Sequence, residues 1–238
     1  MTSYTSSSLF NCSSCGGLIS RMNPASGNTF GVRHWTDGWW DAPWLPENPP
    51  LVKCRLCDEL LWFEDLTEIT EPTCSNTQGD ESESGDSFNM LELPDYFRYS
   101  DSNPDIDPQR MRYVRMRAWR KGNDVRRDSD SVIPLSDTEC ANLEALISFL
   151  DEGDDYDRLI KAEIMRELGR FSEAAKLLTK PFDLSMGFAA VIIRKLVEVQ
   201  DVTVAEIKQP SRTTSPLTKT WGLRWSLFVK WLKSRVCP

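Results

Sequence analysis

Two Cys-x-x-Cys pairs constrain this chain more than any other feature of its sequence. The first pair is Cys12 and Cys15, the second is Cys54 and Cys57, and the 38 residues 16–53 separate them. Two residues between cysteines let one tight turn direct both sulfur atoms at a single ion, and two such turns complete a tetrahedral shell of four thiolates. The spacing therefore predicts a zinc ribbon in which these four cysteines hold one metal ion.

Zinc is the expected ion, although an iron site of the rubredoxin kind uses the same four-sulfur shell. The alternative is that the four cysteines are unrelated buried thiols. Gly16 follows the first pair and Asp58 follows the second, and both residue types tolerate the left-handed backbone that directs peptide N–H groups at sulfur. Four sulfurs leave no position for a catalytic water, so we expect the metal to stabilise the fold and not to catalyse a reaction.

The remaining composition indicates a protein of the cytoplasm. The first ten residues, MTSYTSSSLF, have neither the basic region nor the apolar region of a signal peptide. No apolar run approaches the roughly 20 residues that a membrane-spanning helix needs. Cytoplasmic thiols stay reduced, so we expect the seven cysteines to be metal ligands and free thiols, not disulfides.

The segment between the cysteine pairs is rich in tryptophan and contains the chain's single histidine, His34. Thr36-Asp37-Gly38 is typical of a tight turn between two short strands. Aromatic side chains bury about 150–250 Å² each, so with Phe30 these tryptophans could form a small core over the metal. Alternatively they form a surface that binds a partner, since tryptophan is enriched at binding hot spots. His34 as a ligand or general base is a lesser alternative. The tryptophans in question are Trp35, Trp39, Trp40 and Trp44.

Residues 10–63 resemble a group of uncharacterised bacterial zinc-ribbon proteins. The resemblance lies in Cys-x-x-Cys, then SGNTFG and WTDG followed by two prolines, then LVKCxxC and LLW, and it continues weakly into RAWRKGNDVRR at 117–127. It implies a zinc ribbon followed by a helical remainder, and it implies no activity. The chain departs from the usual zinc-knuckle pattern because its Cys-x-x-Cys turns lack proline and no glycine follows Cys57.

The sequence predicts an α+β protein with four parts. We expect a zinc ribbon with its Trp-rich insertion at 1–66, an acidic and partly disordered linker at 67–103, a helical domain at 104–207 and a basic aromatic tail at 208–238. Asp107-Pro108 and the capping box from Ser136 to Glu139 predict two helix starts. Residues around Gly169 look like the helix-turn-helix joint of a tetratricopeptide repeat, but a single copy predicts one hairpin in a small bundle. The segment 186–199 is apolar on most sides and is expected to be the most buried helix.

Charge is distributed in blocks along the chain. Residues 64–107 carry thirteen acids and one base, 110–127 carry eight bases and one acid, and seven bases but no acid follow Glu206. Such blocks pair with each other or with a charged partner. We expect the 110–127 block to be largely neutralised by the protein's own acids. The tail segment 221–236 is expected to form a helix that packs on the body; a partner-binding or membrane-surface helix are its alternatives.

Three classes of function compete. A non-enzymatic zinc-binding module that binds another protein, acting as a bacterial cytosolic regulator, adaptor or inhibitor, is favoured because no catalytic constellation is present. A nucleic-acid-binding zinc ribbon that uses the Arg-rich helix and exposed tryptophans is disfavoured by the net charge of −8. A hydrolase is the last alternative. The chain has neither GxSxG nor a P-loop, and Asp37 and His34 are the residues on which hydrolysis would depend.

Overall fold

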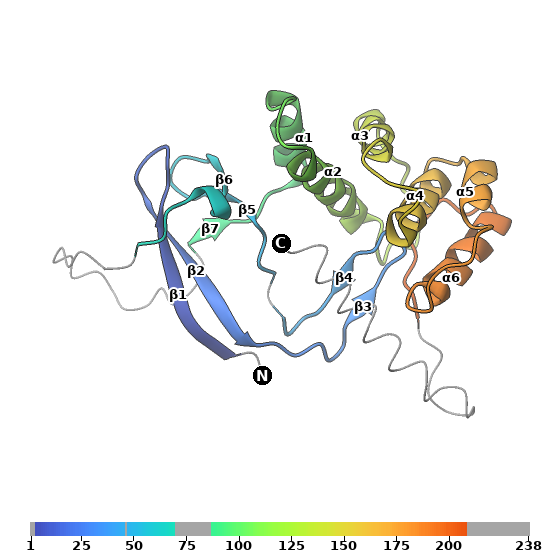
Figure 1. The fold of residues 1–238 in the computed structure, drawn as a ribbon, viewed down its shortest axis with the longest axis horizontal. Helices are drawn as coiled ribbons and strands as arrows, with labels where there is room; N and C mark the ends of the chain where they lie inside the picture. The colour runs from blue at the N-terminus through green and yellow to red at the C-terminus, as the bar shows by residue number, and fades with distance from the viewer. Residues whose placement is uncertain (1–2, 46, 70–86, 209–238) are drawn as a thin grey trace. The chain divides into compact units, whose positions relative to one another are not determined.

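The computed structural model describes residues 3–45, 47–69 and 87–208. It is an α+β protein, as the sequence predicts, with small antiparallel sheets followed by six α-helices among the described residues (Figure 1). The chain divides into two compact units. The N-terminal unit comprises Met1–Val32 and Ala42–Glu92, and the helical unit comprises Arg33–Asp41 and Leu93–Pro238.

The N-terminal unit contains a long β-hairpin and a three-stranded sheet. The hairpin pairs β1 (Ser3–Asn11) with β2 (Leu18–Ser26), and the sheet has the antiparallel order β6-β5-β7. Its strands are β5 (Leu51–Cys54), β6 (Leu60–Trp62) and β7 (Phe88–Asn89), and the short 3₁₀ helix η1 (Phe63–Asp65) follows β6. Each Cys-x-x-Cys pair thus lies where one strand turns into the next, at β1–β2 and at β5–β6.

The core of this unit differs from the expected cluster of insertion tryptophans. Phe63 lies at its centre, edge-on to Phe10 and Phe88 with ring centroids 5.3 and 5.4 Å apart. Phe30 is 78% exposed and Trp44 is 58% exposed, so neither belongs to it. Strand residues supply the core because alternate side chains of β1, β2, β5 and β6 point inward. The apolar core residues are Phe10, Ile19, Val52, Leu61, Phe63 and Phe88.

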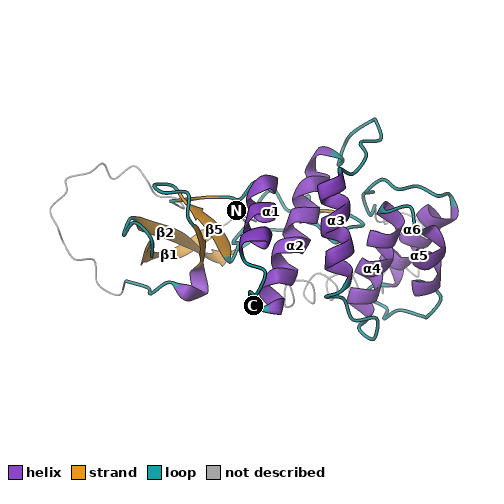
Figure 2. Cartoon of the chain, turned by 90° about the horizontal axis from the view of Figure 1, so that it is seen from above, coloured by secondary structure: helices purple, strands orange, loops and turns teal. Residues whose placement is uncertain are grey.

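The helical unit packs consecutive helices against one another (Figure 2). The predicted helix starts are confirmed: the Asp107 side chain accepts from the N–H groups of Gln109 and Arg110, and Ser136 and Glu139 form a reciprocal capping box. Gly169, with φ +73°, ends α4 and leads into α5 to form the expected hairpin. The helices are α1 (Leu93–Ser102), α2 (Pro108–Gly122), α3 (Asp137–Ile147), α4 (Asp155–Glu167), α5 (Phe171–Leu177) and α6 (Gly187–Glu198), with the 3₁₀ helix η2 (Asn123–Val125) after α2.

The most buried helix is α4, and the expectation that 186–199 would be the most buried is wrong. In α4 eleven of thirteen residues are buried, whereas α6 buries four of twelve. The sequence misleads here because charged residues occupy the interior of α4: Glu163 and Arg166 form an ion pair in which both side chains are fully buried. Arg166 also donates to the backbone carbonyl of Asp201. Charge in a helix is normally a sign of a solvent-facing surface.

The tip of the Trp-rich insertion belongs to the helical unit. Strands β3 (Arg33–His34) and β4 (Trp40–Asp41) form a two-residue hairpin ladder. Backbone bonds join the tip to residues 205–207: the N–H of Thr36 donates to the carbonyl of Ala205 at 2.9 Å, and that of Ile207 to His34 at 2.7 Å. Trp35 and Glu206 form a β-bridge. We call residues 33–41 the inserted hairpin.

Gly38 shows how closely the inserted hairpin approaches the helices. Its φ is +73°, and a Cβ atom added there would lie 2.9 Å from Nη2 of Arg120 and 3.1 Å from Cδ1 of Ile160. Arg120 is itself held by bonds to the carbonyl of Asp37 and the hydroxyl of Tyr156. Glycine is therefore required at this position both by the backbone and by the space available.

These observations shift the domain boundaries expected from sequence. The expected first domain, 1–66, is interrupted by the inserted hairpin, and the expected linker, 67–103, contributes β7 to the N-terminal unit and α1 to the helical unit. The tail helix expected within 208–238 falls outside the described residues beyond Lys208, as do residues 70–86 of the acidic linker. In the part of the chain that is described, no helix is both long and apolar enough to cross a membrane.

Candidate metal centre

The first cysteine turn is built by the β1–β2 connection. The N–H of Gly16 donates to the carbonyl of Cys12 at 2.9 Å, and the N–H of Cys12 donates to Gly17 at 2.8 Å. Gly16 has φ +72°, the left-handed conformation predicted after the second cysteine. This tight turn places Cys12 and Cys15 on one side of the connection.

The second turn, between β5 and β6, repeats the same geometry. The N–H of Cys54 donates to the carbonyl of Glu59 at 2.9 Å, and the N–H of Asp58 donates to the carbonyl of Cys54 at 3.1 Å. Asp58 adopts φ +58°, which confirms that aspartate takes the glycine role here. The N–H of Leu56 lies 3.4 Å from Sγ of Cys54, as expected of a knuckle that donates peptide hydrogens to a thiolate.

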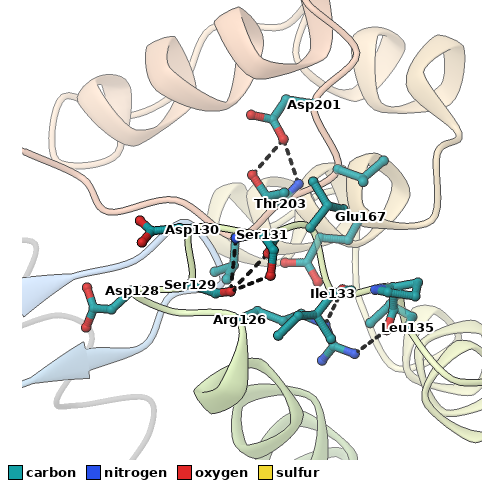
Figure 3. Close-up of a pocket in the computed structure, with 14 residues that line it drawn as sticks. Arg126, Asp128, Ser129, Asp130, Ser131, Ile133, Leu135, Glu167, Asp201 and Thr203 are labelled. Carbon is teal, nitrogen blue, oxygen red and sulfur yellow. Dashed lines mark hydrogen bonds between the residues drawn. The ribbon is translucent and has the colours of Figure 1, made fainter.

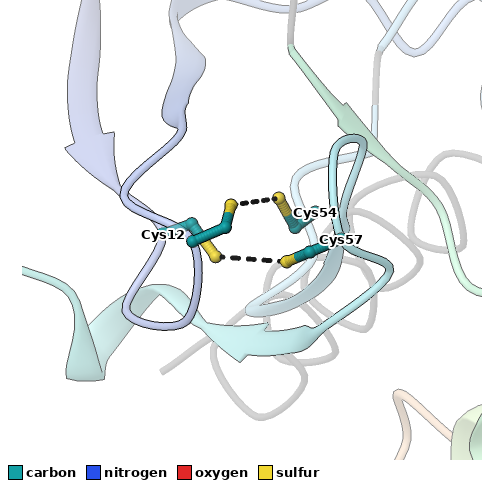
Figure 4. A group of neighbouring side chains, drawn as sticks. Cys12, Cys54 and Cys57 are labelled. Carbon is teal, nitrogen blue, oxygen red and sulfur yellow. Dashed lines mark hydrogen bonds between the residues drawn. The ribbon is translucent and has the colours of Figure 1, made fainter.

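The two turns bring the four predicted ligands together. All four sulfur atoms lie within 4.8 Å of one another, with Cys12 to Cys57 at 3.7 Å and Cys15 to Cys54 at 3.8 Å. Figure 4 shows the two turns facing each other across this cluster. A tetrahedron with metal–sulfur bonds of about 2.3 Å has edges of about 3.8 Å. The cluster therefore has the size and the donor set to hold one metal ion.

Crowding of the four thiols affects their protonation. Burial acts to raise the pKa of Cys12, but hydrogen bonds from the backbone of Cys15 and Ser14 and from neighbouring thiols lower it to about 7. For Cys57 a backbone hydrogen bond involving Glu59 lowers the pKa, yet burial and the other three thiols together raise it to about 12. A bound dication would stabilise the thiolate form of the cysteines that hold it.

His34, the lesser alternative from sequence, and the thiol of Cys140 do not join this cluster. His34 lies in the helical unit, where burial lowers its pKa to about 4 and keeps it neutral. Cys140 lies on α3, and burial, reinforced by Asp137 and Glu139, raises its pKa. Among the described residues the only group of histidine, cysteine, aspartate and glutamate placed to hold a metal is the four-cysteine cluster.

The four candidate partner-binding tryptophans are placed differently from one another. Trp35 is only 5% exposed and lies between the guanidinium groups of Arg33 and Arg127, 4.7 and 5.7 Å from its ring centroid. Trp39 and Trp40 are half-buried in the inserted hairpin, and Trp44 in the N-terminal unit is largely exposed. Of the four, Trp44 offers the most surface to a partner.

The helical unit contains a buried polar network that the sequence analysis did not predict. Asp37, fully buried, accepts hydrogen bonds from Asn123 at 3.2 Å and from the N–H of Trp39 at 2.9 Å, and it forms an ion pair with Arg127. Asn123 also donates to Glu167. These bonds occupy the Asp37 carboxylate, which the hydrolase alternative would have needed.

Glu167 is the most perturbed carboxyl group of this network. Burial, followed by repulsion from Glu163, raises its pKa to about 8, and Trp119 Nε1 donates to it at 2.8 Å. In the sequence only the turn at Asp37 is recognisable as a motif. The other members of the network, on α2, η2 and α4, lie more than 80 positions after Asp37 in the chain.

Comparison of the chain with protein-family models, with curated proteins and with solved structures gave no match.

Proposed function

We propose that the chain is a non-enzymatic zinc-binding protein in which Cys12, Cys15, Cys54 and Cys57 hold one Zn²⁺. The observation that carries the proposal is the cluster of four sulfur atoms, with two edges of 3.7 and 3.8 Å. Four cysteines fill a tetrahedral shell, so the ion has no open position for water or substrate and serves as a structural staple.

Metal analysis of the purified full chain tests this proposal. Elemental analysis should give about one zinc per chain, and Cys54→Ser should remove most of it because three thiolates leave the shell incomplete. Cys140→Ser is the matched control, since that thiol lies in the other unit and should leave the zinc content unchanged. Visible absorption with one iron per chain would make the ion iron, while a Cys12–Cys15 disulfide without metal would refute the site.

The staple closes a loop whose tip is the inserted hairpin. Residues 16–53 lie between the two cysteine turns, and residues 33–41 within them pack in the helical unit. Cross-linking a loop of about 40 residues lowers the entropy of the unfolded chain by an amount worth about 4 kcal/mol in the chain-entropy model. Removing the metal should thus destabilise the helical unit as well, which we expect as a lower urea midpoint in far-UV circular dichroism. The midpoint of Cys54→Ser should shift in the same direction.

We further propose that the partner is another protein and that the exposed aromatic side chains of the N-terminal unit contribute to its binding. Phe30 and Trp44 are large exposed aromatics, and tryptophan at a binding surface can contribute 2 kcal/mol or more. A bacterial cytosolic regulator, adaptor or inhibitor fits this combination. In a pull-down with the full chain, Trp44→Ala should lose the partner, whereas Leu184→Ala, an exposed apolar residue of the helical unit, should retain it.

The arginines of α2 and of the two positions that follow η2 favour a protein partner over nucleic acid. Arg112 pairs with Asp157, Arg126 with Glu139 and Arg127 with Asp37, so internal carboxylates already bind much of this basic block. The acids of these three pairs come from the inserted hairpin, α3 and α4. Tight binding to DNA that weakens by orders of magnitude between about 50 and 200 mM salt would contradict this reading.

A further inference from the structure

The helical unit contains a cavity of about 460 Å³ (Figure 3). Its walls come from the loop 128–135, from Glu167 at the end of α4 and from the segment 201–204. Val132 is 67% exposed, and Ile133 and Val202 are also exposed. The cavity therefore presents apolar side chains that the described part of the chain leaves uncovered, and its volume lies in the range of pockets that hold an organic ligand.

The charged groups at the cavity are mostly acidic. Its lining has one base, Arg126, which both oxygens of Glu139 already bind. Asp128 is paired with Arg33. Asp130 and Asp201 form no ion pair with any described residue, and Figure 3 shows them on two sides of the cavity. The cavity combines apolar side chains with the carboxylate of Asp130 and with that of Asp201, which accepts hydrogen bonds from Thr203 but has no cationic partner among the described residues, so it favours an occupant that is both apolar and cationic.

The chain itself continues from this cavity into a segment of that chemistry. Residues 201–204 form one wall, and Lys208, the last residue described, follows four residues later. After Glu206 the chain carries seven bases and no acid, and its last eighteen residues, WGLRWSLFVKWLKSRVCP, contain three of its nine tryptophans. The twelve residues 209–220 can span up to about 43 Å when extended, which is ample to bring 221–236 back to the cavity.

We propose that this cavity is the docking site of the chain's own basic, aromatic segment 221–236. An indole of that segment enters between Val132 and Val202, and its lysines and arginines pair with Asp130 and Asp201. A short tether supplies an effective concentration in the millimolar range, so an intrinsic dissociation constant of about 100 µM is enough to keep the site about 90% occupied. Docking also covers aromatic surface that monomeric proteins rarely leave exposed.

Photo-crosslinking of the full chain tests the site. A benzophenone amino acid in place of Val132 should crosslink to peptides from 221–236, identified by mass spectrometry. The same group in place of Leu184, an equally exposed position outside the cavity lining, should not. Mixing isotope-labelled and unlabelled chains separates crosslinks within one chain from crosslinks between two. Crosslinks between chains, equal yields from both positions, or none to 221–236 would overturn the proposal.

Charge reversal tests the electrostatic part independently. Asp130→Lys should weaken docking by about two- to fivefold, the effect of losing one exposed ion pair, so the occupancy and with it the crosslinking yield at Val132 should fall from about 90% to about 67–83%. Asp101→Lys, which makes the same change of charge at an exposed position on α1, should leave the yield unchanged. Equal losses from both variants would show that only net charge matters and that the cavity's carboxylates do not contact the segment.

Discussion

Replacing Gly38 by alanine should destabilise the helical unit more than a left-handed backbone alone requires. A non-glycine residue in this conformation costs about 1–2 kcal/mol. At Gly38 the new methyl group must also displace Arg120 and Ile160, 2.9 and 3.1 Å away. Arg120 cannot simply turn aside, because it is hydrogen-bonded to the hairpin and to Tyr156. Overpacking of this kind costs about 1–3 kcal/mol. We therefore expect Gly38→Ala to lower the free energy of unfolding by about 2–5 kcal/mol.

Gly169→Ala provides the matched control. Gly169 has the same φ of +73° and belongs to the same unit, but nothing lies within 4 Å of the Cβ it would gain. This variant should lose only the backbone cost of about 1–2 kcal/mol. Urea unfolding followed by circular dichroism at 222 nm measures both, and each kcal/mol should also lower Tm by about 2–4 °C. Equal destabilisation of the two variants would refute the close approach of the inserted hairpin to α2 and α4.

Three further predictions concern the buried groups of the helical unit, each measured as a urea midpoint. Asp37→Ala removes the fully buried partner of Arg127 and leaves that guanidinium only the partly exposed Asp124, so it should cost up to about 3–5 kcal/mol. Asp128→Ala, in a pair where Asp128 is 63% exposed, should cost less than about 1 kcal/mol; similar losses would argue against the buried pair. Because its folded pKa is raised to about 8, Glu167 should make stability fall as pH rises from about 4.5 through 8, and Glu167→Gln should flatten that slope. The folded pKa of His34 is lowered to about 4, so its contribution is present above pH 6.5 and lost as pH falls toward 4; an unchanged acid limb in His34→Gln would contradict this.

The parts of the fold that the sequence predicted are those decided by neighbouring residues. The two cysteine turns, the left-handed Gly16 and Asp58, and the helix caps at Asp107 and Ser136 each depend on contacts within about five residues. The chemistry of each cap or turn is therefore complete in the local sequence. The metal ligands could be found for the same reason, because two local turns define them.

The inserted hairpin could not be assigned in this way. Its tip is rich in aromatics and lies between the cysteine pairs, so proximity in sequence favoured the metal centre. Its actual partners are Asn123 and Arg127 and the backbone of residues 205–207, between 86 and 173 positions away. Contacts between residues so far apart leave no periodic pattern in the sequence. The buried charges of α4 were not predicted for a related reason. A pattern of charged residues does not reveal whether the side chains face water or pair with other residues of the protein.

The inserted hairpin also orders events in time during synthesis of the chain. Residues 33–41 emerge early, but their last partner, Ile207, is made 166 residues after Asp41. At about 5–20 residues per second, roughly 8–33 s pass before the hairpin can complete its backbone bonds. Both cysteine turns are complete once residue 59 has been made, long before that. A metal bound at this stage would hold the two ends of the loop together before the helices have been made. The tryptophan-rich tip would then have fewer conformations to search before it contacts the helices, and its apolar surface would be less exposed to other nascent chains.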